Sequence, residues 1–472
     1  MDVARISAVF RLLLFYFILA FAFWAIGDIQ IRTREMYADM PAADSVVGEI
    51  TAGTVIEQTF VSGYDSIEKF TLCVATYARS NRGILTVALL ENQTQEQLAE
   101  LRMDASLLED NSYYEWPLET PLVSAKGRSY TIRVTSDCLP GEAPTIYCSN
   151  EPSEDTRLLI NGADGGQMLC FSFCGRSVTW FGAHYWLLAG AGAVVLTLYG
   201  LWVALCERQG KATLAGTYAA LWKRYRFLVQ QLVSRDFKKK YKRSLLGYLW
   251  SFLNPLLTML VQYIVFSTIF RSDIKNFPVY LLSGIILFNF FTDAVSQGLS
   301  AIIGNASLIT KVYVPKYIYP VTRVISSSIN LLISILPLLL VALLTRAPVT
   351  KALLLLPFAL ICLIGFSIGM ALMLSSAMVF FRDTQYLWGI FSLIWMYATP
   401  LFYPETIIPP QYRWIQVWNP MYYMVKFVRI LLIDGVSPSP RLYGICIISA
   451  LASLIVGGFV FKKTQDRFVL YI

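Results

Sequence analysis

Residues 234–257 read SRDFKKKYKRSLLGYLWSFLNPLL and join a block of positive charge to the start of a long apolar run. Six basic residues lie between Arg235 and Arg243, with Asp236 as the one acid among them. Cytoplasmic loops of membrane proteins are enriched in Lys and Arg. The stretch therefore predicts a cytoplasmic segment that turns into a membrane span, and a span so close to the basic block argues against nucleic-acid binding.

The overall composition is that of a membrane protein. Of the 472 residues, 56% are hydrophobic and 15% are charged, whereas soluble proteins average about 25% charged residues. A spanning helix needs about 20 mostly apolar residues. Eight windows meet that requirement: 8–27, 183–205, 248–270, 279–301, 324–345, 352–381, 384–404 and 442–461. We predict a mainly α membrane protein with about eight transmembrane helices, two of them in the N-terminal part of the chain.

The first window has two interpretations. A charged start followed by an apolar run is typical of a secretory signal peptide. No small-x-small cleavage site follows, because residues 25–35 read AIGDIQIRTRE. An N-terminal transmembrane anchor over 1–27 is therefore favoured.

Charge is distributed unevenly along the chain, and its distribution predicts the topology. Residues 28–180 hold 22 of the 31 acidic residues and 11 of the 39 basic ones. The positive-inside rule places the basic segment 207–243 in the cytoplasm. Counting spans outward from it places residues 28–180 outside the plasma (inner) membrane and both termini in the cytoplasm.

Residues 28–180 have the pattern of a β-sandwich. Short segments rich in β-branched and aromatic residues, such as GILTVALLE and SYTIRVTS, are separated by turns. Their order loosely resembles jelly-roll modules that bind carbohydrate. A sugar-stacking platform would use four aromatic residues, for which a place in the core or at its rim is the alternative: Tyr113, Tyr114, Trp116 and Tyr130.

Five of the eight cysteines lie in this segment. An oxidising compartment permits disulfides, and Cys138 and Cys148, which flank a short loop containing Pro and Gly, are the best candidate pair. A metal site is disfavoured, because the one histidine of the chain, His184, lies at the end of a span.

A second transmembrane helix is expected over 183–206, followed by an amphipathic helix within 207–243. Its apolar residues recur with a helical period, at Leu214, Tyr218, Leu221, Trp222, Tyr225, Leu228, Val229 and Leu232. A basic amphipathic helix lies in the membrane interface. Its predicted interfacial residues are Trp222, Lys223, Arg224 and Tyr225.

Five motifs in one order carry a resemblance to a known family. They are RDFKKKYKRSLLGYLWSFLNPLL, VYVPKYIYPVTRVISSSIN, FFRDTQYLW, YATPLFYPETIIPP and WNPMYYMVKFVRILL. Residues 228–472 thereby resemble the permease subunit of ABC-2 type exporters of O-antigen, capsule or teichoic acid. The resemblance implies a six-helix permease core over 244–472, a second copy of the chain, two ABC ATPase subunits and a lipid-linked polysaccharide. Two extra spans and the β-domain are departures from the common form.

The energy source is expected in a partner, because the chain contains no G-x-x-x-x-G-K-[ST] sequence. The motif GADGGQ at 162–167 lacks the following Lys. No constellation typical of an enzyme is present either. We therefore predict a transport subunit without a cofactor of its own, whose partner ATPase binds ATP and Mg.

Polar residues in window 279–301 predict the translocation path. Asn289, Asp293 and Gln297 share one helical face, and polar groups in spans usually face a cavity or a bundle interior. Asp293 has two interpretations, as part of a glycan path or as the partner of a buried donor such as Arg323. Because sugar C–H faces stack on aromatic rings, the path is extended by Tyr397, Phe402 and Tyr403.

The resemblance also implies where the ATPase acts and where the glycan leaves. Coupling residues are expected in two cytoplasmic connections, for which interfacial anchoring is the alternative: Lys311, Tyr313, Pro315 and Lys316, then Arg382 and Asp383. Residues 400–436 contain too many prolines for one span, so short re-entrant helices are predicted at the exit. Its gate residues, for which an aromatic belt is the alternative, are Trp414, Trp418, Tyr422 and Tyr423.

Together these observations predict a permease subunit that exports a lipid-linked cell-surface polysaccharide. Two alternatives stay open. One is an ABC-2 exporter of a lipid or drug, and the other is a membrane-anchored protein that binds or modifies glycans. Membrane lipids are expected partners in each case.

Overall fold

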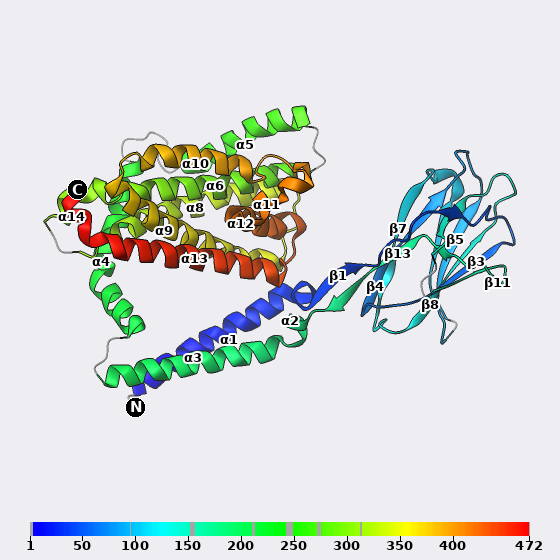
Figure 1. Cartoon of the computed structure of the whole chain (residues 1–472), viewed down its shortest axis with the longest axis horizontal. Coiled ribbons are helices and arrows are strands. Elements are labelled where there is room, and N and C mark those ends of the chain that lie inside the picture. Colours follow the sequence, from blue (N-terminus) through cyan, green and yellow to red (C-terminus); the bar gives the residue numbers. More distant parts are fainter. Residues whose placement is uncertain are drawn as a thin grey trace. The chain divides into compact units, whose positions relative to one another are not determined.

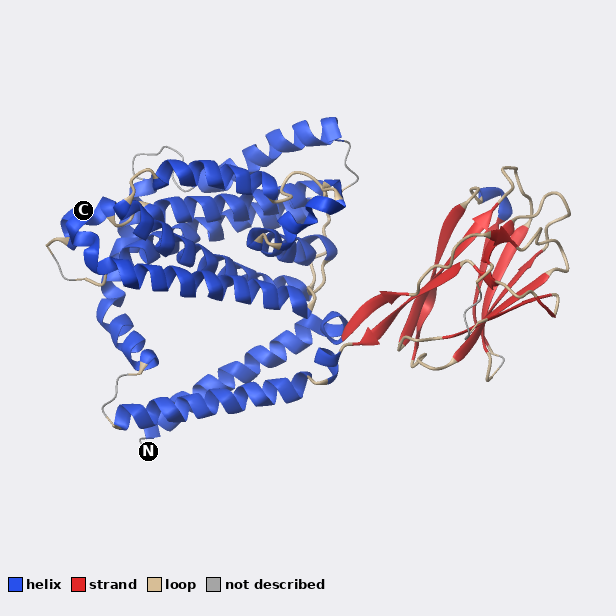
Figure 2. Ribbon diagram, viewed as in Figure 1, coloured by secondary structure: helices blue, strands red, loops and turns tan. Residues whose placement is uncertain are grey.

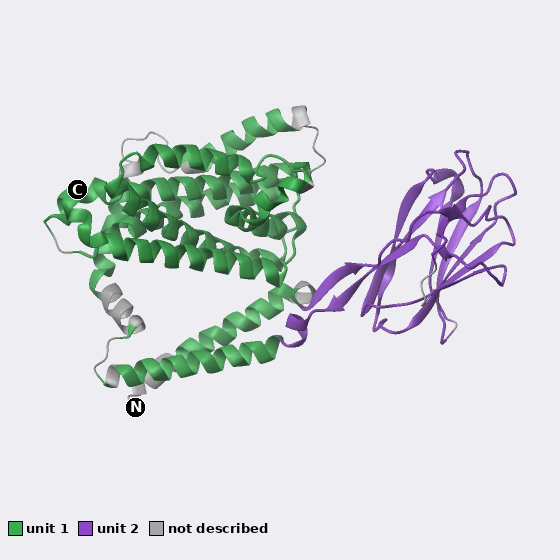
Figure 3. Ribbon diagram, in the orientation of Figure 1, with its two compact units in different colours: residues 1–31, 185–472 green, residues 32–184 purple. Residues whose placement is uncertain are grey.

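The computed structural model describes residues 3–471, apart from 95, 152–155, 210–212, 242–248, 271–273, 275 and 312–313. The chain divides into two compact units (Figure 3). Unit 1 comprises Met1–Ile31 and Tyr185–Ile472, and unit 2 comprises Arg32–His184. Among the described residues, unit 1 is helical and all strands lie in unit 2 (Figure 2).

Unit 2 is built from two antiparallel sheets. The seven-stranded sheet contains β1 (Thr33–Tyr37), β13 (Phe171–Val178), β4 (Ser66–Ala75), β9 (Thr145–Ser149), β12 (Met168–Leu169), β2 (Ser45–Val46) and β7 (Ser112–Val123). The six-stranded sheet has the order β11 (Ala163–Asp164), β10 (Arg157–Ile160), β3 (Val55–Val61), β8 (Ser129–Ser136), β5 (Ile84–Glu91) and β6 (Gln97–Asp104). The predicted β-rich domain is therefore present.

Alternation along the strands forms the core of unit 2. In β3, the buried residues Ile56, Gln58 and Phe60 alternate with more exposed ones, as expected for a strand with one buried face. The Phe60 ring lies 5.3 Å from Phe171 and 5.9 Å from Tyr130, measured between centroids.

Of the two interpretations of the four aromatic residues, a place in the core applies to two of them. Trp116 and Tyr130 are buried in the core of unit 2. The Trp116 indole N–H donates to Met103 Sδ at 2.7 Å. Tyr114 is half-buried and packs against the same core, and Tyr113 is exposed. Burial of the apolar parts of these rings stabilises the fold more than exposure at the surface would. Because two of the rings are buried, the four side chains do not form a shared platform.

Unit 1 contains most of the helices, and Figure 1 labels all of them except α7. They are α1 (Val3–Arg32), α3 (Tyr185–Arg208), α4 (Leu214–Tyr241), α5 (Leu249–Phe270), α6 (Phe277–Leu299), α7 (Ala306–Ile309), α8 (Ile318–Leu344), α9 (Leu356–Phe380), α10 (Thr384–Ala398), α11 (Arg413–Val417), α12 (Pro420–Arg429), α13 (Pro440–Thr464) and α14 (Phe468–Tyr471). A short helix, α2 (Trp180–Ala183), belongs to unit 2.

The helix lengths agree with a multi-pass membrane protein. Within the described residues, six helices are long and apolar enough to span a bilayer: α1, α3, α6, α8, α9 and α13. The other two predicted spans fall on α5 (Leu249–Phe270), whose described side chains include the apolar stretch Phe252–Phe266, and on α10, which has 15 residues. The window 384–404 was thus predicted too long, because the helix ends at Ala398 and irregular backbone follows.

Helix α6 lies at the centre of the helical core. It packs against α5, α8, α9, α10 and α12, and its apolar residues are almost all buried in one hydrophobic cluster. The core has two ends. One of them contains the C-termini of α6, α9 and α13 and the N-termini of α8 and α10, and we call it the α14 end. The opposite end, which contains α11 and α12, is called the α12 end (Figure 1).

Helices α9 and α13 approach closely because small residues face each other. A Cβ atom on Gly369 would overlap the backbone of Ser453, and one on Gly457 would overlap the Gly369 carbonyl. Small residues let helix backbones meet in membranes, where apolar side chains gain little by leaving lipid. The contact thus depends on the absence of a side chain at Gly369.

Gly369→Ala is expected to destabilise the protein by about 1–3 kcal/mol, because α9 and α13 must separate. Gly365→Ala, one turn away, is the control, since a Cβ there would lie 3.6 Å from Leu454 Cδ1, an ordinary contact. The measurement is the midpoint of thermal aggregation in detergent. Equal midpoints for the two variants would contradict the packing argument.

Candidate functional site

One face of α6 is polar, and the described part of the protomer covers it only in part. Apart from Pro278 in the first turn, every α6 residue that is not buried is polar: Asn289, Thr292, Asp293, Ser296 and Gln297. Polar residues within spans usually face a bundle interior or a water-filled cavity. The predicted path residues of this helix therefore share one open face.

Hydrogen bonds organise this polar face. Gln297 Nε2 donates to Asp293 Oδ2 at 2.8 Å, and the Trp388 indole of α10 donates to Ser296 Oγ at 2.9 Å. Arg323, one predicted partner of Asp293, instead lies 3.4 Å from Asp236 Oδ2. These two contacts of the face come from α6 itself and from α10.

The helices that flank the polar face carry aromatic groups and almost no charge. The segments α5, α6 and α10 contain a single ionisable acid, Asp293, and no Lys or Arg. Tyr397 of α10 is 61% exposed, and the Tyr403 hydroxyl donates to its carbonyl at 2.6 Å. Phe402 is buried and stacks on Phe266, with ring centroids 5.5 Å apart. Within one protomer Phe402 therefore packs in the core, and its place on the path stays a prediction.

At the α12 end, a buried arginine holds the backbone that follows α10. The Arg429 guanidinium donates to the carbonyls of Pro400 at 2.7 Å and of Leu401 at 3.1 Å. It also donates to the Tyr280 carbonyl at 3.1 Å, and its Cζ lies 3.3 Å from the Tyr280 ring centroid. Irregular backbone at membrane depth persists only where protein or water satisfies its polar groups. The Arg429 guanidinium satisfies the Pro400 and Leu401 carbonyls of this segment.

Sequence reasoning missed Arg429, although a signal was present. Within WNPMYYMVKFVRILL, Lys426 and Arg429 are the charged residues of an otherwise apolar run. A charge in such a run indicates a specific buried partner. The backbone carbonyls that it satisfies cannot be read from side-chain types.

The predicted exit-gate residues divide into two groups. Trp414 and Trp418 are strongly exposed. Tyr422 is buried, and its hydroxyl donates to Glu405 Oε2 at 2.7 Å. Lys426 Nζ lies 2.7 Å from the same carboxylate oxygen, which joins α12 to the segment after α10. Tyr423 is half-buried, and its ring centroid is 5.0 Å from that of Tyr422.

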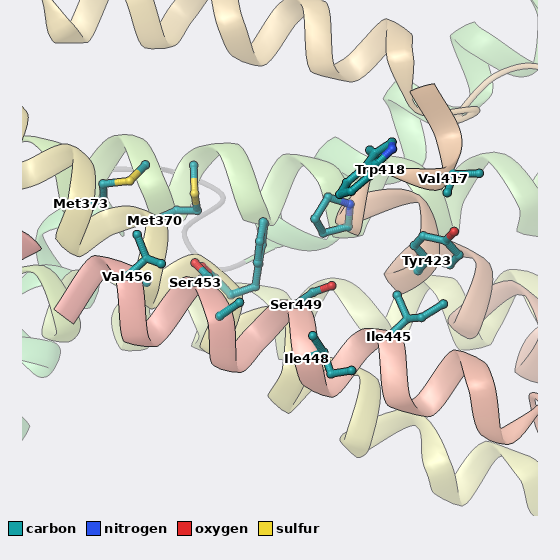
Figure 4. Close-up of a pocket in the computed structure, with 14 residues that line it drawn as sticks. Met370, Met373, Val417, Trp418, Tyr423, Ile445, Ile448, Ser449, Ser453 and Val456 are labelled. Atoms are coloured by element: carbon teal, nitrogen blue, oxygen red, sulfur yellow. The ribbon is translucent and has the colours of Figure 1, made fainter. Parts of the chain in front are cut away.

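A largely apolar pocket of about 420 Å³ adjoins the exposed tryptophans. Figure 4 shows Trp418 and Tyr423 at one end of the pocket and Met370 and Met373 of α9 at the other. Residues of α13, among them Ile448 and Ser453, form another wall. The two predicted gate residues Trp418 and Tyr423 thus line a space between helices.

At the α14 end, the predicted coupling residues have different environments. Lys311, Arg382 and Asp383 are exposed, and Pro315 is half-buried. Lys316 Nζ donates to the Gln465 carbonyl at 2.6 Å and lies 5.9 Å from the Phe468 ring centroid. Lys316 therefore holds the C-terminal segment. Tyr313 lies outside the described residues.

The amphipathic helix α4 contacts the α14 end of the core through its apolar face. Leu232 is buried there, and Tyr225, Leu228 and Val229 pack against the same cluster. The buried Asp236 carboxylate pairs with Arg235 at 2.9 Å, beside its contact with Arg323. Among the predicted interfacial residues, Arg224 is exposed over the Tyr225 ring. The side chains of Trp222 and Lys223 lie outside the described residues.

The cysteines of unit 2 are free thiols, so the Cys138–Cys148 disulfide is not formed. Cys148 Sγ instead lies 3.1 Å from Ser45 Oγ. Cys170 neighbours Cys73 across the sheet, where the Cys73 N–H donates to the Cys170 carbonyl at 3.1 Å. Burial, with a smaller effect of Cys73, raises the pKa of the Cys170 thiol to about 12. A protonated thiol is a poor metal ligand, and the described residues contain no group of three His, Cys, Asp or Glu side chains that would hold a metal.

Comparison with known proteins identifies the helical core. The ABC-2 type transporter family matches residues 228–433, from within α4 to the segment after α12. Over 185 residues, the chain is 35% identical to the O-antigen export system permease protein RfbA of Myxococcus xanthus, covering 39% of this chain and 71% of that protein. The chain belongs to the ABC-2 type transporter family.

Two further relatives match a longer part of this ABC-2 permease. The O-antigen export system permease protein RfbA of Klebsiella pneumoniae is 29% identical over 243 residues, which cover 51% of this chain and 93% of the relative. The polysialic acid transport protein KpsM of Escherichia coli is 24% identical over 247 residues, which cover 50% and 93%. The residues that match the family, 228–433, include the polar face of α6 and Arg429 with the carbonyls that it binds.

Arg429→Met is expected to destabilise the permease by about 3–5 kcal/mol, because three buried carbonyls lose a charged donor. Arg413→Met, at an exposed position of α11, is the control. Thermal aggregation of the detergent-solubilised protein measures the difference. A melting point for Arg429→Met equal to that of the control would contradict the role of Arg429.

Proposed function

We propose that this permease is the membrane subunit of an ATP-driven exporter that moves a lipid-linked cell-surface polysaccharide across the plasma membrane. The observation that carries the proposal is the polar face of α6. A hydrophilic polymer needs a continuous wet path through about 30 Å of hydrocarbon. A face that displays amide, hydroxyl and carboxylate groups suits such a path.

The polar face also supports a homodimer. Ionisable and amide groups facing lipid at membrane depth cost several kcal/mol, so the uncovered face of α6 requires cover. Helix α10, beside it, exposes large residues such as Leu387, Phe391 and Ile394. A second copy that packs along these helices would enclose the polar face and form a passage between the protomers. Exposed aromatic groups such as Tyr397 would then offer stacking surfaces for sugar rings.

The energy for export comes from two copies of an ABC ATPase. These subunits bind ATP and Mg and dock at the α14 end. Membership of the family supports such a partnership. The α14 end then faces the cytoplasm, with both termini inside and residues 28–180 outside. The exposed residues Lys311, Arg382 and Asp383 are proposed contacts. Lys316 acts on coupling indirectly, because it binds the C-terminal segment.

The substrate class is proposed from the relatives, which are named for O-antigen export and polysialic acid transport. O-antigen, capsule and teichoic-acid chains share the polar, sugar-rich character that the α6 face suits. The apolar pocket beside Trp418 favours a second candidate, export of a lipid. A polysaccharide would use the polar face of α6, whereas a lipid would use the apolar pocket beside Trp418.

Replacing both Asn289 and Ser296 by Leu is expected to reduce polysaccharide export at least tenfold, because the path loses its polar groups. The complex with the ATPase is expected to assemble normally. The control is Ile361→Leu on the exposed face of α9, which should export like the wild type. Surface polysaccharide is measured by immunoblotting of intact cells that express the permease with its ATPase. Normal export by the double variant would overturn the polysaccharide path and favour the lipid function.

A further inference from the structure

The C-terminal segment, residues 465–471, closes a hydrophobic cluster at the α14 end. Phe468 is fully buried, with its ring centroid 5.2 Å from Phe461 of α13 and 6.0 Å from Phe380 of α9. Leu232 of α4 and Tyr319 of α8 belong to the same cluster. One buried ring thus brings together the ends of four helices.

The same segment is tied to both predicted coupling connections. Lys316, just before α8, donates to the Gln465 carbonyl at 2.6 Å. Phe380 immediately precedes the turn that contains Arg382 and Asp383, and its ring lies 5.0 Å from that of Tyr471. A displacement of the segment would therefore act on both connections at once.

The outer surface of this segment has the character of a protein interface. Leu470 is 81% exposed and Val469 is 53% exposed, and Phe381, beside Phe380, is 72% exposed. Charged residues of both signs surround these apolar groups and are themselves exposed: Lys462, Lys463, Asp466, Arg467, Arg382 and Asp383. An apolar centre with a charged rim is typical of protein–protein interfaces.

The charges distinguish a protein partner from a membrane surface. Anionic headgroups attract basic segments, whereas Asp466 and Asp383 would be repelled by them. A partner protein can match both signs. The surface is also continuous with the exposed residues that were predicted to contact the ATPase.

We propose that residues 465–471, together with Phe381, form part of the surface on which the ABC ATPase docks, and that Phe468 transmits ATPase movement to α8 and α9. This inference rests on the proposed function. Leu470 and Val469 would insert into an apolar depression of the ATPase, and the charged rim would set the orientation.

The test is the affinity of the detergent-solubilised permease for its separately purified ATPase, measured by biolayer interferometry. Leu470→Asp is expected to weaken binding at least tenfold, because an anchor residue is replaced by a charge. Leu107→Asp is the matched control, since Leu107 is 75% exposed in unit 2, and it should bind like the wild type. Phe468→Ala is expected to reduce permease-stimulated ATP hydrolysis together with thermal stability.

Three outcomes are distinguishable. Wild-type affinity for Leu470→Asp would overturn the docking surface. Wild-type affinity combined with loss of Leu470→Asp from the membrane fraction would also overturn it and assign the segment to lipid. A wild-type permease that binds no ABC ATPase would contradict the proposed function itself.

Discussion

The structure depends on one constraint: a polar helix face cannot remain in contact with lipid. Helix α6 is buried by α5, α8, α9 and α12 on its apolar side. Its remaining face carries Asn289, Asp293 and Gln297. Packing within the described part of the protomer therefore positions these groups and leaves Asn289 exposed and the other two half-buried. Under the proposed function, a passage between two copies of the chain would supply both water and cover for this face.

The two ends of the core deal with irregular backbone in different ways. At the α12 end, Arg429 satisfies carbonyls that follow α10, and the Glu405–Lys426 pair joins the next segment to α12. At the α14 end, the aromatic cluster around Phe468 joins helix ends, and the buried Asp236 carboxylate of α4 pairs with Arg235 and Arg323. The first arrangement fixes one geometry through directional bonds. The second relies mainly on apolar and aromatic packing, which is less directional.

Much of the architecture could be predicted from the sequence. Apolar windows predicted the long helices, and alternation in segments such as GILTVALLE predicted the β-domain. The order of five motifs indicated the family. The polar face of α6 was predicted because helical periodicity alone places Asn289, Asp293 and Gln297 together. By contrast, the burial of Phe402 and Trp116 could not be predicted, since an aromatic residue suits a core as well as a sugar surface. The roles of Arg429, Lys316 and Phe468 depend on contacts with backbone or with distant segments, which residue types do not reveal.

The most direct test of the account is the water accessibility of the α6 face. Ser296→Cys and Ile361→Cys variants of the permease, assembled with its ATPase, would be treated with a membrane-impermeant methanethiosulfonate during ATP hydrolysis, and labelling would be compared with that of the native thiols. Modification of Ser296→Cys, with Ile361→Cys remaining unmodified because it faces lipid, is the predicted result. A Ser296→Cys variant that stays as unreactive as Ile361→Cys in every nucleotide state would contradict the account.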